Sequence, residues 1–259
     1  WLGIPYAAAP TGSLRWAPPQ PPAGWDSVRS AIRFGDACPQ FASRLDTGTG
    51  DGAGALRGGE DCLYLNVFAP GDARPHSLPV MFFIHGGGNS IGTSASYDAS
   101  VLAQEQGIVV VTINYRLGLL GWLSHPILRQ QALSTDAASG NFALLDMIAA
   151  LRWVQGNIGV FGGDPGRVTL FGESAGGRNI YGLLASPRSA GLFHGAIVQS
   201  GFPGTFSLEQ AENPFREPEP GHPNSSHELL SAWLRRSPEQ SDEEIAASLT
   251  QLSGSELLA

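Results

Sequence analysis

Three short apolar runs stand out in the pattern of hydrophobic and polar positions along the chain. They cover residues 80–84, 108–113 and 168–171, and turn-forming residues bound each of them. Runs of this length that are rich in β-branched and aromatic side chains are typical of strands buried on both faces of a parallel sheet. The pattern therefore predicts three neighbouring parallel strands.

Helical periodicity alternates with these runs. Between residues 144 and 158 apolar side chains recur at three- and four-residue steps, which predicts a helix with one apolar face. A shorter helix is expected over residues 98–106, where Gly107 provides a stop signal. Strands separated by helices predict the α/β class, with a doubly wound, mostly parallel sheet and helices on both faces.

The whole chain, residues 1–259, is interpreted as a single domain, and residues 202–259 as the start of a more variable helical region. Capping boxes predict two short helices there, one at Ser225 with Glu228 and one at Ser241 with Glu244. The last residues form another apolar run with nothing after it to cover it. We therefore expect the domain to be truncated.

Composition and charge narrow the classes of function. A hydrophobic content of 42% with 15% charged residues is typical of a globular protein. No apolar run reaches the ~18 residues of a membrane span, and no signal peptide is visible at the N-terminus. The formal net charge of −8 argues against nucleic acid or anionic lipid as a partner. Cys38 and Cys62 could form a disulfide or remain two separate buried thiols.

The first candidate for chemistry follows the third apolar run. There the chain reads Gly-Glu-Ser-Ala-Gly, with Ser174 at its centre and a helix expected over residues 174–184. The G-x-S-x-G pattern alone is weak in a chain with 34 glycines. Its position between a strand and a helix, however, is the context of a nucleophile elbow. The helix N-terminus would offer amide donors to a developing negative charge.

A second motif, His-Gly-Gly-Gly at residues 85–88, follows the first apolar run. The carboxyl ends of strands are where open α/β sheets place their ligand sites. Successive glycines let backbone N–H groups approach an oxyanion, although a plain glycine turn explains this stretch alone equally well. No metal or nucleotide cofactor is expected, because no ligand cluster has metal spacing and the HGGGNS stretch lacks the lysine of a phosphate loop.

With further stretches, these motifs resemble the type-B carboxylesterase family, which includes the cholinesterases. The matching stretches run in the family's order from residue 2 to residue 201: LGIPYAAAP, SLRWAPPQPP, ACPQ, GEDCLYLNVFAP, VMFFIHGGG, VVVTINYRLGLLGWLS, GNFALLDMIAALRWVQGNIGVFGGDPGRVTLFGESAGG and GLFHGAIVQSG. The resemblance implies an α/β-hydrolase fold and a serine carboxylesterase that hydrolyses carboxylic esters. Family members are much longer, so the resemblance also implies an N-terminal portion of the fold.

The resemblance assigns roles at the site. It implies Ser174 as the acylated nucleophile and an oxyanion hole formed by the N–H groups of Gly87, Gly88 and Ala175. Glu173 matches the acid that precedes the nucleophile, either as a polar support near the leaving group or as a buried structural acid. One position departs from the family, which commonly has an aromatic residue where this chain has Asn89. We expect that change to alter the acyl side of the pocket.

The resemblance also implies structural elements around the site. Cys38 and Cys62 match the family's first disulfide, which favours a secreted or periplasmic location. The pairs Arg15 with Glu60 and Arg116 with Asp146 match structural ion pairs. His194 matches a position where the family often has a structural histidine.

The catalytic acid and base are the open question. A serine hydroxyl becomes a good nucleophile only when a neighbouring base takes its proton. In this fold the histidine usually follows the serine in the chain. Of the six histidines, His222 and His227 follow Ser174 and belong to no other motif. Three interpretations compete, in this order. The acid and histidine belong to a segment or an associating chain that supplies the rest of the fold; the chain is a non-catalytic binding domain or inactive fragment; or a compact esterase uses His222 or His227. A small-molecule ester is the expected substrate under the first and third.

Overall fold

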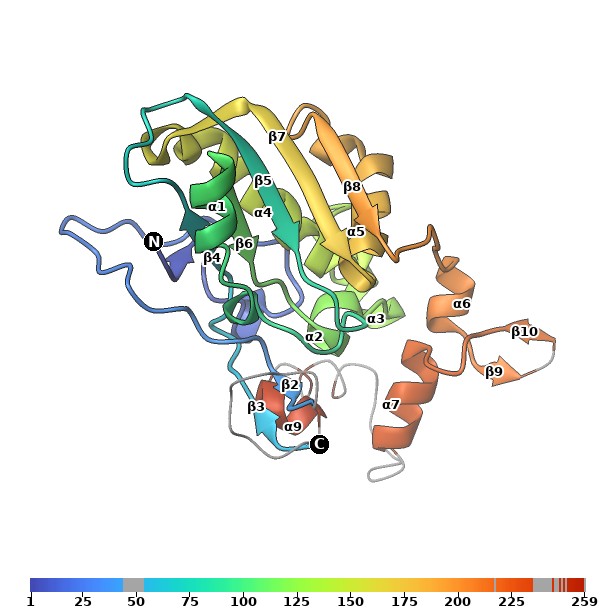
Figure 1. The fold of residues 1–259 in the computed structure, drawn as a ribbon. Helices are drawn as coiled ribbons and strands as arrows, with labels where there is room; N and C mark the ends of the chain where they lie inside the picture. Colours follow the sequence, from blue (N-terminus) through green and yellow to red (C-terminus); the bar gives the residue numbers. More distant parts are fainter. Residues whose placement is uncertain are drawn as a thin grey trace.

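A six-stranded sheet forms the centre of the molecule, with its strands in the order β1-β4-β6-β5-β7-β8 (Figure 1). The computed structural model describes residues 1–43, 54–216, 218–234, 244, 247, 249 and 251–258. In chain order the strands are β1 (Ile4–Pro5), β4 (Tyr64–Phe68), β5 (Leu78–Ile84), β6 (Val109–Ile113), β7 (Gly163–Glu173) and β8 (Gly195–Gln199). Strands β6, β5, β7 and β8 pair in parallel, whereas β1 and β4 are added antiparallel at one edge. The predicted mostly parallel α/β sheet is confirmed.

The three apolar runs form the middle of this sheet. They correspond to β5, β6 and β7, and all five residues of β6 are buried. β6 lies between β4 and β5, so its side chains are covered on both faces and its backbone is paired on both sides. The apolar pattern alone did not indicate β1, β4 and β8, which lie toward the edges of the sheet.

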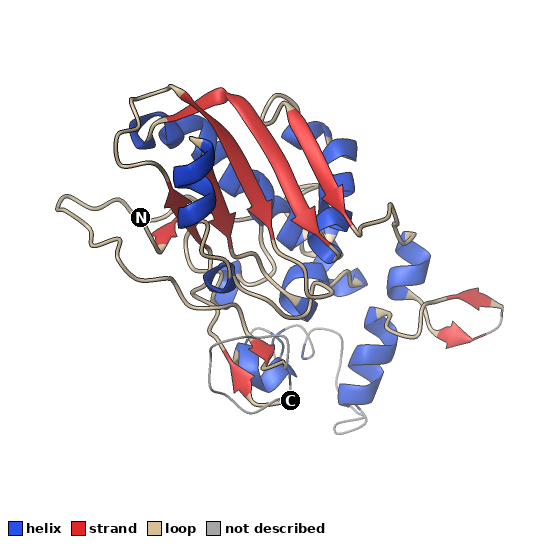
Figure 2. Cartoon of the chain, viewed as in Figure 1, coloured by secondary structure: helices blue, strands red, loops and turns tan. Residues whose placement is uncertain are grey.

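Helices cover both faces of the sheet (Figure 2). α4 (Phe142–Asn157) and α5 (Ala175–Ala185) pack on one face, where Met147 and Ile180 join Phe82 in the main core. α1 (Ser100–Gln106) lies on the other face, where Ala103 packs in a smaller cluster with Val110. α1 ends where predicted, because Gly107 takes the left-handed conformation at φ +61°.

The free edge of the sheet is β8. Within the described residues β8 pairs with β7 alone, and the side chain of Ile197 in this strand is 46% exposed. A strand with one unpaired side and exposed apolar side chains is a template for further strand pairing. The sheet is therefore open toward β8.

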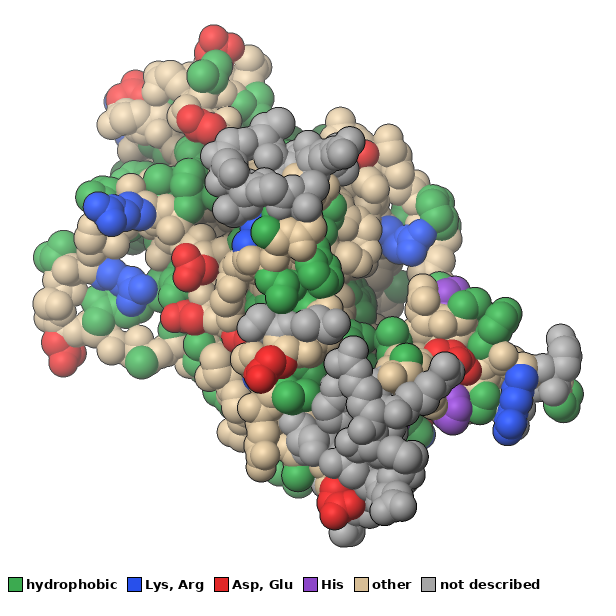
Figure 3. Space-filling model, turned by 90° about the horizontal axis from the view of Figure 1, so that it is seen from below, with side chains coloured by type: hydrophobic (Ala, Val, Ile, Leu, Met, Phe, Trp, Pro, Cys, Tyr) green, Lys and Arg blue, Asp and Glu red, His purple; other side chains and the backbone are tan. Residues whose placement is uncertain are grey.

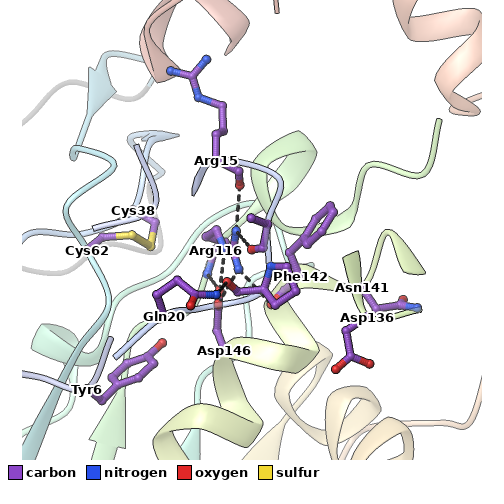
Figure 4. A network of polar contacts seen from close by, with 12 residues as sticks. Tyr6, Arg15, Gln20, Cys38, Cys62, Arg116, Asp136, Asn141, Phe142 and Asp146 are labelled. Atoms are coloured by element: carbon purple, nitrogen blue, oxygen red, sulfur yellow. Dashed lines mark hydrogen bonds and ion pairs between the residues drawn. A yellow bond between two sulfur atoms is a disulfide. The ribbon is translucent and has the colours of Figure 1, made fainter. Parts of the chain in front are cut away.

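The disulfide and both ion pairs implied by the resemblance are confirmed. Cys38 and Cys62 form a disulfide, with their Cα atoms 5.0 Å apart. A cross-link that closes a loop of this length stabilises the folded state by about 3 kcal/mol, mainly because it restricts the unfolded chain. Figure 4 shows Arg116 at the centre of a polar network, where its Nη2 lies 2.7 Å from Oδ1 of Asp146 in α4. Its Nη1 also donates to the carbonyl oxygen of Arg15 at 2.7 Å.

The Arg15 guanidinium forms the second ion pair. It donates from Nε and Nη2 to the two carboxylate oxygens of Glu60, each at 2.7 Å. A two-stranded sheet of β2 (Gln40–Phe41) and β3 (Leu56–Arg57) lies in the same N-terminal region. These contacts connect the N-terminal region to the main sheet through Arg116.

The C-terminal segment contains small elements that follow β8. They are α6 (Leu208–Glu212), the hairpin of β9 (Phe215–Arg216) and β10 (Glu219–Pro220), α7 (Ser226–Leu234) and α9 (Gly254–Leu258). Two other short helices, α2 (Gly118–Trp122) and α3 (Pro126–Gln130), follow β6. None of the helices in the described part of the chain combines the length and apolar character of a membrane span.

One of the two predicted capping boxes forms in part. The Ser225 hydroxyl accepts the amide of Glu228 at 3.3 Å at the start of α7, as a capping box requires. The Glu228 carboxylate, however, accepts the amide of Phe215 at 2.9 Å and so holds the neighbouring hairpin. The second predicted box involves Ser241, which lies outside the described residues.

Candidate active site

Ser174 occupies a sharp turn between β7 and α5. β7 ends at Glu173 and α5 begins at Ala175, and Ser174 between them has φ +55° and ψ −117°. Residues other than glycine rarely adopt a positive φ, because this backbone conformation is strained. They keep it only where contacts with the surrounding structure stabilise it. Here the Ser174 amide donates to the carbonyl oxygen of Gln199 at the end of β8, at 2.9 Å. The strand-to-helix elbow predicted from the sequence is present.

The glycines of the motif are required by close backbone contacts. A Cβ atom at Gly176 would collide with the carbonyl oxygen of Ile84, the last residue of β5. A Cβ atom at Gly172 would lie 2.8 Å from the carbonyl carbon of Gly176. The motif therefore lets the turn press against the end of the neighbouring strand.

The Ser174 side chain does not cap the helix that it precedes. Ser174 is half-buried and stands at the N-cap of α5. Within the described residues its Oγ atom forms no hydrogen bond. An uncommitted hydroxyl at the N-terminus of an eleven-residue helix lies where the backbone N–H groups favour negative charge.

The glycine triplet lies beside this elbow. A Cβ atom at Gly86 would lie 3.3 Å from the Ser174 Cβ atom and 2.9 Å from Oε2 of Glu173. Gly87 and Gly88 follow with φ of +98° and +64°, which glycine adopts without strain. The triplet follows β5 and Ser174 follows β7, so both motifs meet at the carboxyl ends of adjacent strands. Figure 3 shows the molecule from the side toward which these strands point in Figure 1.

The residue before the triplet anchors it to the core. His85 is 1% exposed, and its ring stacks on that of Tyr115 with 4.4 Å between the ring centroids. The Tyr115 hydroxyl donates to the carbonyl oxygen of His85 at 2.8 Å. Burial raises the pKa of Tyr115, with a smaller contribution from Tyr97. The Tyr115 hydroxyl therefore remains a neutral hydrogen-bond donor over the physiological range.

Glu173 is exposed to solvent in this chain. Among the described residues no element covers this side chain, which does not fit the interpretation of Glu173 as a buried structural acid. Its role as a support near the leaving group stays a prediction.

The histidines that precede the tail have structural contacts. His194 donates its backbone amide to the carbonyl oxygen of Val168 at 2.7 Å, and its Nδ1 accepts the Val168 amide at 3.2 Å. The Nδ1 atom of His125 accepts the Ile127 amide at the start of α3. His194 thus ties the segment before β8 to β7, in keeping with the structural role that the resemblance implies.

The two downstream histidines are also placed. The Nδ1 atom of His222 accepts the amide of Asn224 at 3.0 Å, and its ring packs edge-on against Phe206. His227 is exposed on α7. In the part of the chain that the structure describes, no histidine forms a hydrogen bond with Ser174, so the base for this serine stays unidentified.

Asn89, the position that departs from the resemblance, is held by two partners that the sequence analysis did not indicate. Its Oδ1 accepts the side-chain amide of Asn179 at 2.8 Å, and Tyr115 donates to the same oxygen at 3.3 Å. Asn179 lies in α5, ninety residues further along the chain. Nothing in the local sequence pattern marks Asn179, because the contact depends on how α5 packs beside the glycine loop.

Comparison with known proteins gives consistent results. A model of the carboxylesterase family matches residues 1–247. The chain is 50% identical to the fumonisin B1 esterase of Sphingopyxis macrogoltabida over 202 residues, and 46% identical to the para-nitrobenzyl esterase of Bacillus subtilis (strain 168) over 213 residues. The structure of a thermophilic para-nitrobenzyl esterase aligns with a TM-score of 0.81 at 40% identity, and that of a Geobacillus stearothermophilus carboxylesterase with 0.77 at 36%.

The shares of each protein covered by these matches differ. The match to the fumonisin B1 esterase covers 77% of this chain and 36% of the relative. The match to the para-nitrobenzyl esterase covers 82% of this chain and 42% of the relative. Both structural alignments cover 100% of this chain and 48% of the matched chain. The chain therefore spans less than half the length of these relatives.

Proposed function

Because this chain belongs to the carboxylesterase family, we propose that it supplies the nucleophile and oxyanion hole of a serine carboxylesterase, with Ser174 as the acylated residue. The observation that carries the proposal is the strained turn at Ser174, whose φ is +55°. Such strain is retained where the surrounding structure over-determines it, and here adjacent glycines and the end of β8 hold it. Packing alone gives no reason for a serine at this position.

The proposed oxyanion hole consists of the N–H groups of Gly87, Gly88 and Ala175. The adjacency of Gly86 to Ser174 supports this assignment, since it brings the glycine loop against the elbow. Ala175 is the first residue of α5, so its N–H group needs no partner within the helix. Removal of one such donor typically costs about 3 kcal/mol of transition-state stabilisation.

The reaction proceeds in two steps. The base takes the hydroxyl proton of Ser174 as Oγ attacks the acyl carbon of a carboxylic ester, the bond from that carbon to the alcohol oxygen breaks, and the alcohol leaves with that proton. Water then attacks the acyl-enzyme, which releases the acid and restores the serine. The acid and histidine would come from a further segment or an associated chain. The open edge at β8 is consistent with such an addition to the sheet.

The substrate class is proposed only as carboxylic esters of small molecules. The relatives are named for different esters, a fumonisin B1 esterase and a para-nitrobenzyl esterase, so these names do not narrow the substrate class further. The Cys38–Cys62 disulfide supports a secreted or periplasmic location, because disulfides persist in oxidising compartments.

The test is covalent labelling of the folded chain with a serine-directed fluorophosphonate, followed by intact-mass measurement. With the segment or chain that supplies the base present, we expect a single adduct on Ser174 and none in Ser174→Ala. Ser200→Ala is the matched control, because Ser200 also has a positive φ, +52°, and directly follows β8. This control should still carry the adduct.

The outcomes separate the alternatives. A single adduct lost only in Ser174→Ala means that a base already reaches this serine, in this chain or in an assembly of it. A folded chain that carries no adduct even with that segment or chain present contradicts an activated Ser174, and the alternative of a non-catalytic or inactive hydrolase-like domain would then be preferred.

A further inference from the structure

Two asparagine side chains join the glycine loop to the helix that begins at the nucleophile. The Asn89 amide nitrogen donates to Oδ1 of Asn179 at 3.2 Å, and the Asn179 nitrogen donates to Oδ1 of Asn89 at 2.8 Å. Each amide is therefore donor and acceptor to the other. We refer to these two residues as the amide pair.

The loop end of the amide pair is held on both its backbone and its side chain. Asn89 has φ +59°, a conformation that asparagine tolerates better than most residues. Its carbonyl oxygen accepts the amide of Gly118 at the start of α2, at 2.7 Å, and its Oδ1 also accepts the Tyr115 hydroxyl. Asn89 thus connects the glycine loop to α2 and to the core residue that supports His85.

The helix end of the amide pair is buried. Asn179 is 3% exposed and lies in the second turn of α5, five residues after Ser174. A buried amide that loses its partner leaves unsatisfied polar atoms, which costs about 1–3 kcal/mol. The pair therefore resists any displacement of the loop relative to the helix.

We propose that Asn89 and Asn179 are positioning residues that set the distance between the glycine loop and Ser174. The proposal rests on the proposed function, in which Gly87 and Gly88 of this loop provide oxyanion donors. Such donors act only when they lie within about 0.5 Å of the productive geometry, so the loop needs a fixed reference on the element that carries the nucleophile. The amide pair provides that reference.

The test is residue-resolved amide hydrogen exchange on the folded chain, which does not depend on any activity of Ser174. The amides of Ser90 and Ile91 both donate to the carbonyl oxygen of Gly87 at 3.1 Å, so their protection reports on the loop. We expect Asn179→Ala to accelerate exchange at both amides about tenfold. The substitution removes both hydrogen bonds between Asn179 and Asn89 without changing any residue of the loop itself.

Two variants at Asn89 separate the amide contact from backbone strain. Asn89→Gly removes the side chain but accepts φ +59° freely, so accelerated exchange in this variant comes from loss of the amide contacts. Asn89→Asp keeps an acceptor for Asn179 and Tyr115 but loses the donor, and it should give an intermediate acceleration. The double variant Asn89→Gly with Asn179→Ala should exceed neither single variant by more than about twofold.

The matched control is Gln155→Ala. The Gln155 amide also bridges separate backbone segments, donating to the carbonyl oxygens of Pro165 and Leu192, but it lies away from the loop. This variant should leave exchange at Ser90 and Ile91 unchanged. The Ser94 amide, which donates to Oδ1 of Asn114 at 2.7 Å, serves as an internal reference in every variant.

The results decide between the proposals. Unchanged exchange at Ser90 and Ile91 in Asn179→Ala overturns the positioning role, whatever the fluorophosphonate experiment shows. Equal acceleration at Ser94 also overturns it, since that result would mean general loosening. If exchange responds as expected and Ser174 is labelled, the labelling rate of Asn179→Ala should fall about tenfold or more. If exchange responds and Ser174 is never labelled, even with the segment or chain that supplies the base present, the proposed function fails while the positioning role of the amide pair stands.

Discussion

Apolar side chains are buried to different extents in two regions of the molecule. We call residues 64–201 the α/β layer and residues 202–258 the C-terminal segment. In the layer, side chains such as Val111 and Leu151 are fully buried between the sheet and its helices. In the C-terminal segment, Phe202 and Phe215 are each more than 60% exposed. Figure 1 shows the β9–β10 hairpin projecting from the body of the molecule, and Figure 3 shows hydrophobic side chains open to one face.

The C-terminal segment is attached through apolar and polar contacts, since Leu230 and Leu249 are buried in one cluster with residues such as Phe142. The Glu212 carboxylate of α6 accepts the Ser124 hydroxyl at 2.7 Å and pairs with Arg129 at 2.8 Å. Glu60 accepts the amide of Gly254 at the start of α9 at 3.0 Å. The difference between the regions shows that an apolar pattern produces a core only where a second element covers it.

The largest expected effect is in the layer, at the buried ion pair of Arg116 and Asp146. Arg116→Met leaves an unpaired carboxylate that is 0% exposed, so the free energy of unfolding should fall by about 3–5 kcal/mol in urea titrations. Arg167→Met is the control, because its pair with Asp164 is solvent-exposed, and its urea midpoint should hardly move. Similar losses in both variants would contradict a layer stabilised by this network.

A smaller effect is expected from backbone crowding at the elbow. Gly176→Ala places a Cβ atom against the Ile84 carbonyl, so we expect a loss of about 1–3 kcal/mol in the free energy of unfolding. Gly182→Ala, later in the same helix, meets only the Leu144 side chain at 3.2 Å and gains helix propensity. Thermal melts should show Gly182→Ala close to the unmodified chain. Equal destabilisation would mean that the elbow is no tighter than the rest of α5.

The attachment of the tail is tested by Glu212→Gln. Removal of the carboxylate weakens bonds to Ser124 and Arg129, worth about 1.5–3 kcal/mol for hydrogen bonds to a charged group. Because Leu230 and Leu249 keep the apolar contacts of the tail with the body when Glu212 is changed, we expect faster amide exchange at Ala211 and Asn213 and an unchanged unfolding midpoint for the layer. A matching drop in the midpoint would show that the two regions unfold as one unit.

The smallest effect is a pH dependence at α9. Hydrogen bonds from the Ser253 hydroxyl and amide lower the pKa of Glu256. A lowered pKa in the folded state means that this contribution is complete above the unfolded pKa, about 4.3, and is lost as pH falls through the folded value. Amide exchange at Leu257, corrected for intrinsic rates, should accelerate on acidification from about pH 5 to pH 3. Glu256→Gln should abolish that dependence, and a dependence that survives would place its origin elsewhere.

Much of the layer was predictable because its signals are local. The apolar runs indicated the central strands β5, β6 and β7, and Gly107 indicated a left-handed helix end, which has φ +61°. β8 was not predicted from the pattern, since its residues are partly exposed and its strand conformation depends on pairing with β7.

At the site, the order of motifs along the chain pointed to Ser174 and the glycine triplet. The residues that position them did not emerge from that order, because Asn179 and Asn89 are ninety residues apart and meet only when α5 packs on the sheet. The same holds for Glu173, whose exposure depends on what covers it and not on its neighbours in the sequence.

The α/β class, the elbow glycines and the resemblance to a family follow from the amino-acid sequence alone, because they depend on local sterics, hydrophobic periodicity and the order of motifs. The folded structure was needed to show which strands lie at the edges, which side chains hold the glycine loop and which histidines already have other contacts. These properties arise from contacts between segments distant in the chain, and no short stretch of residues specifies them.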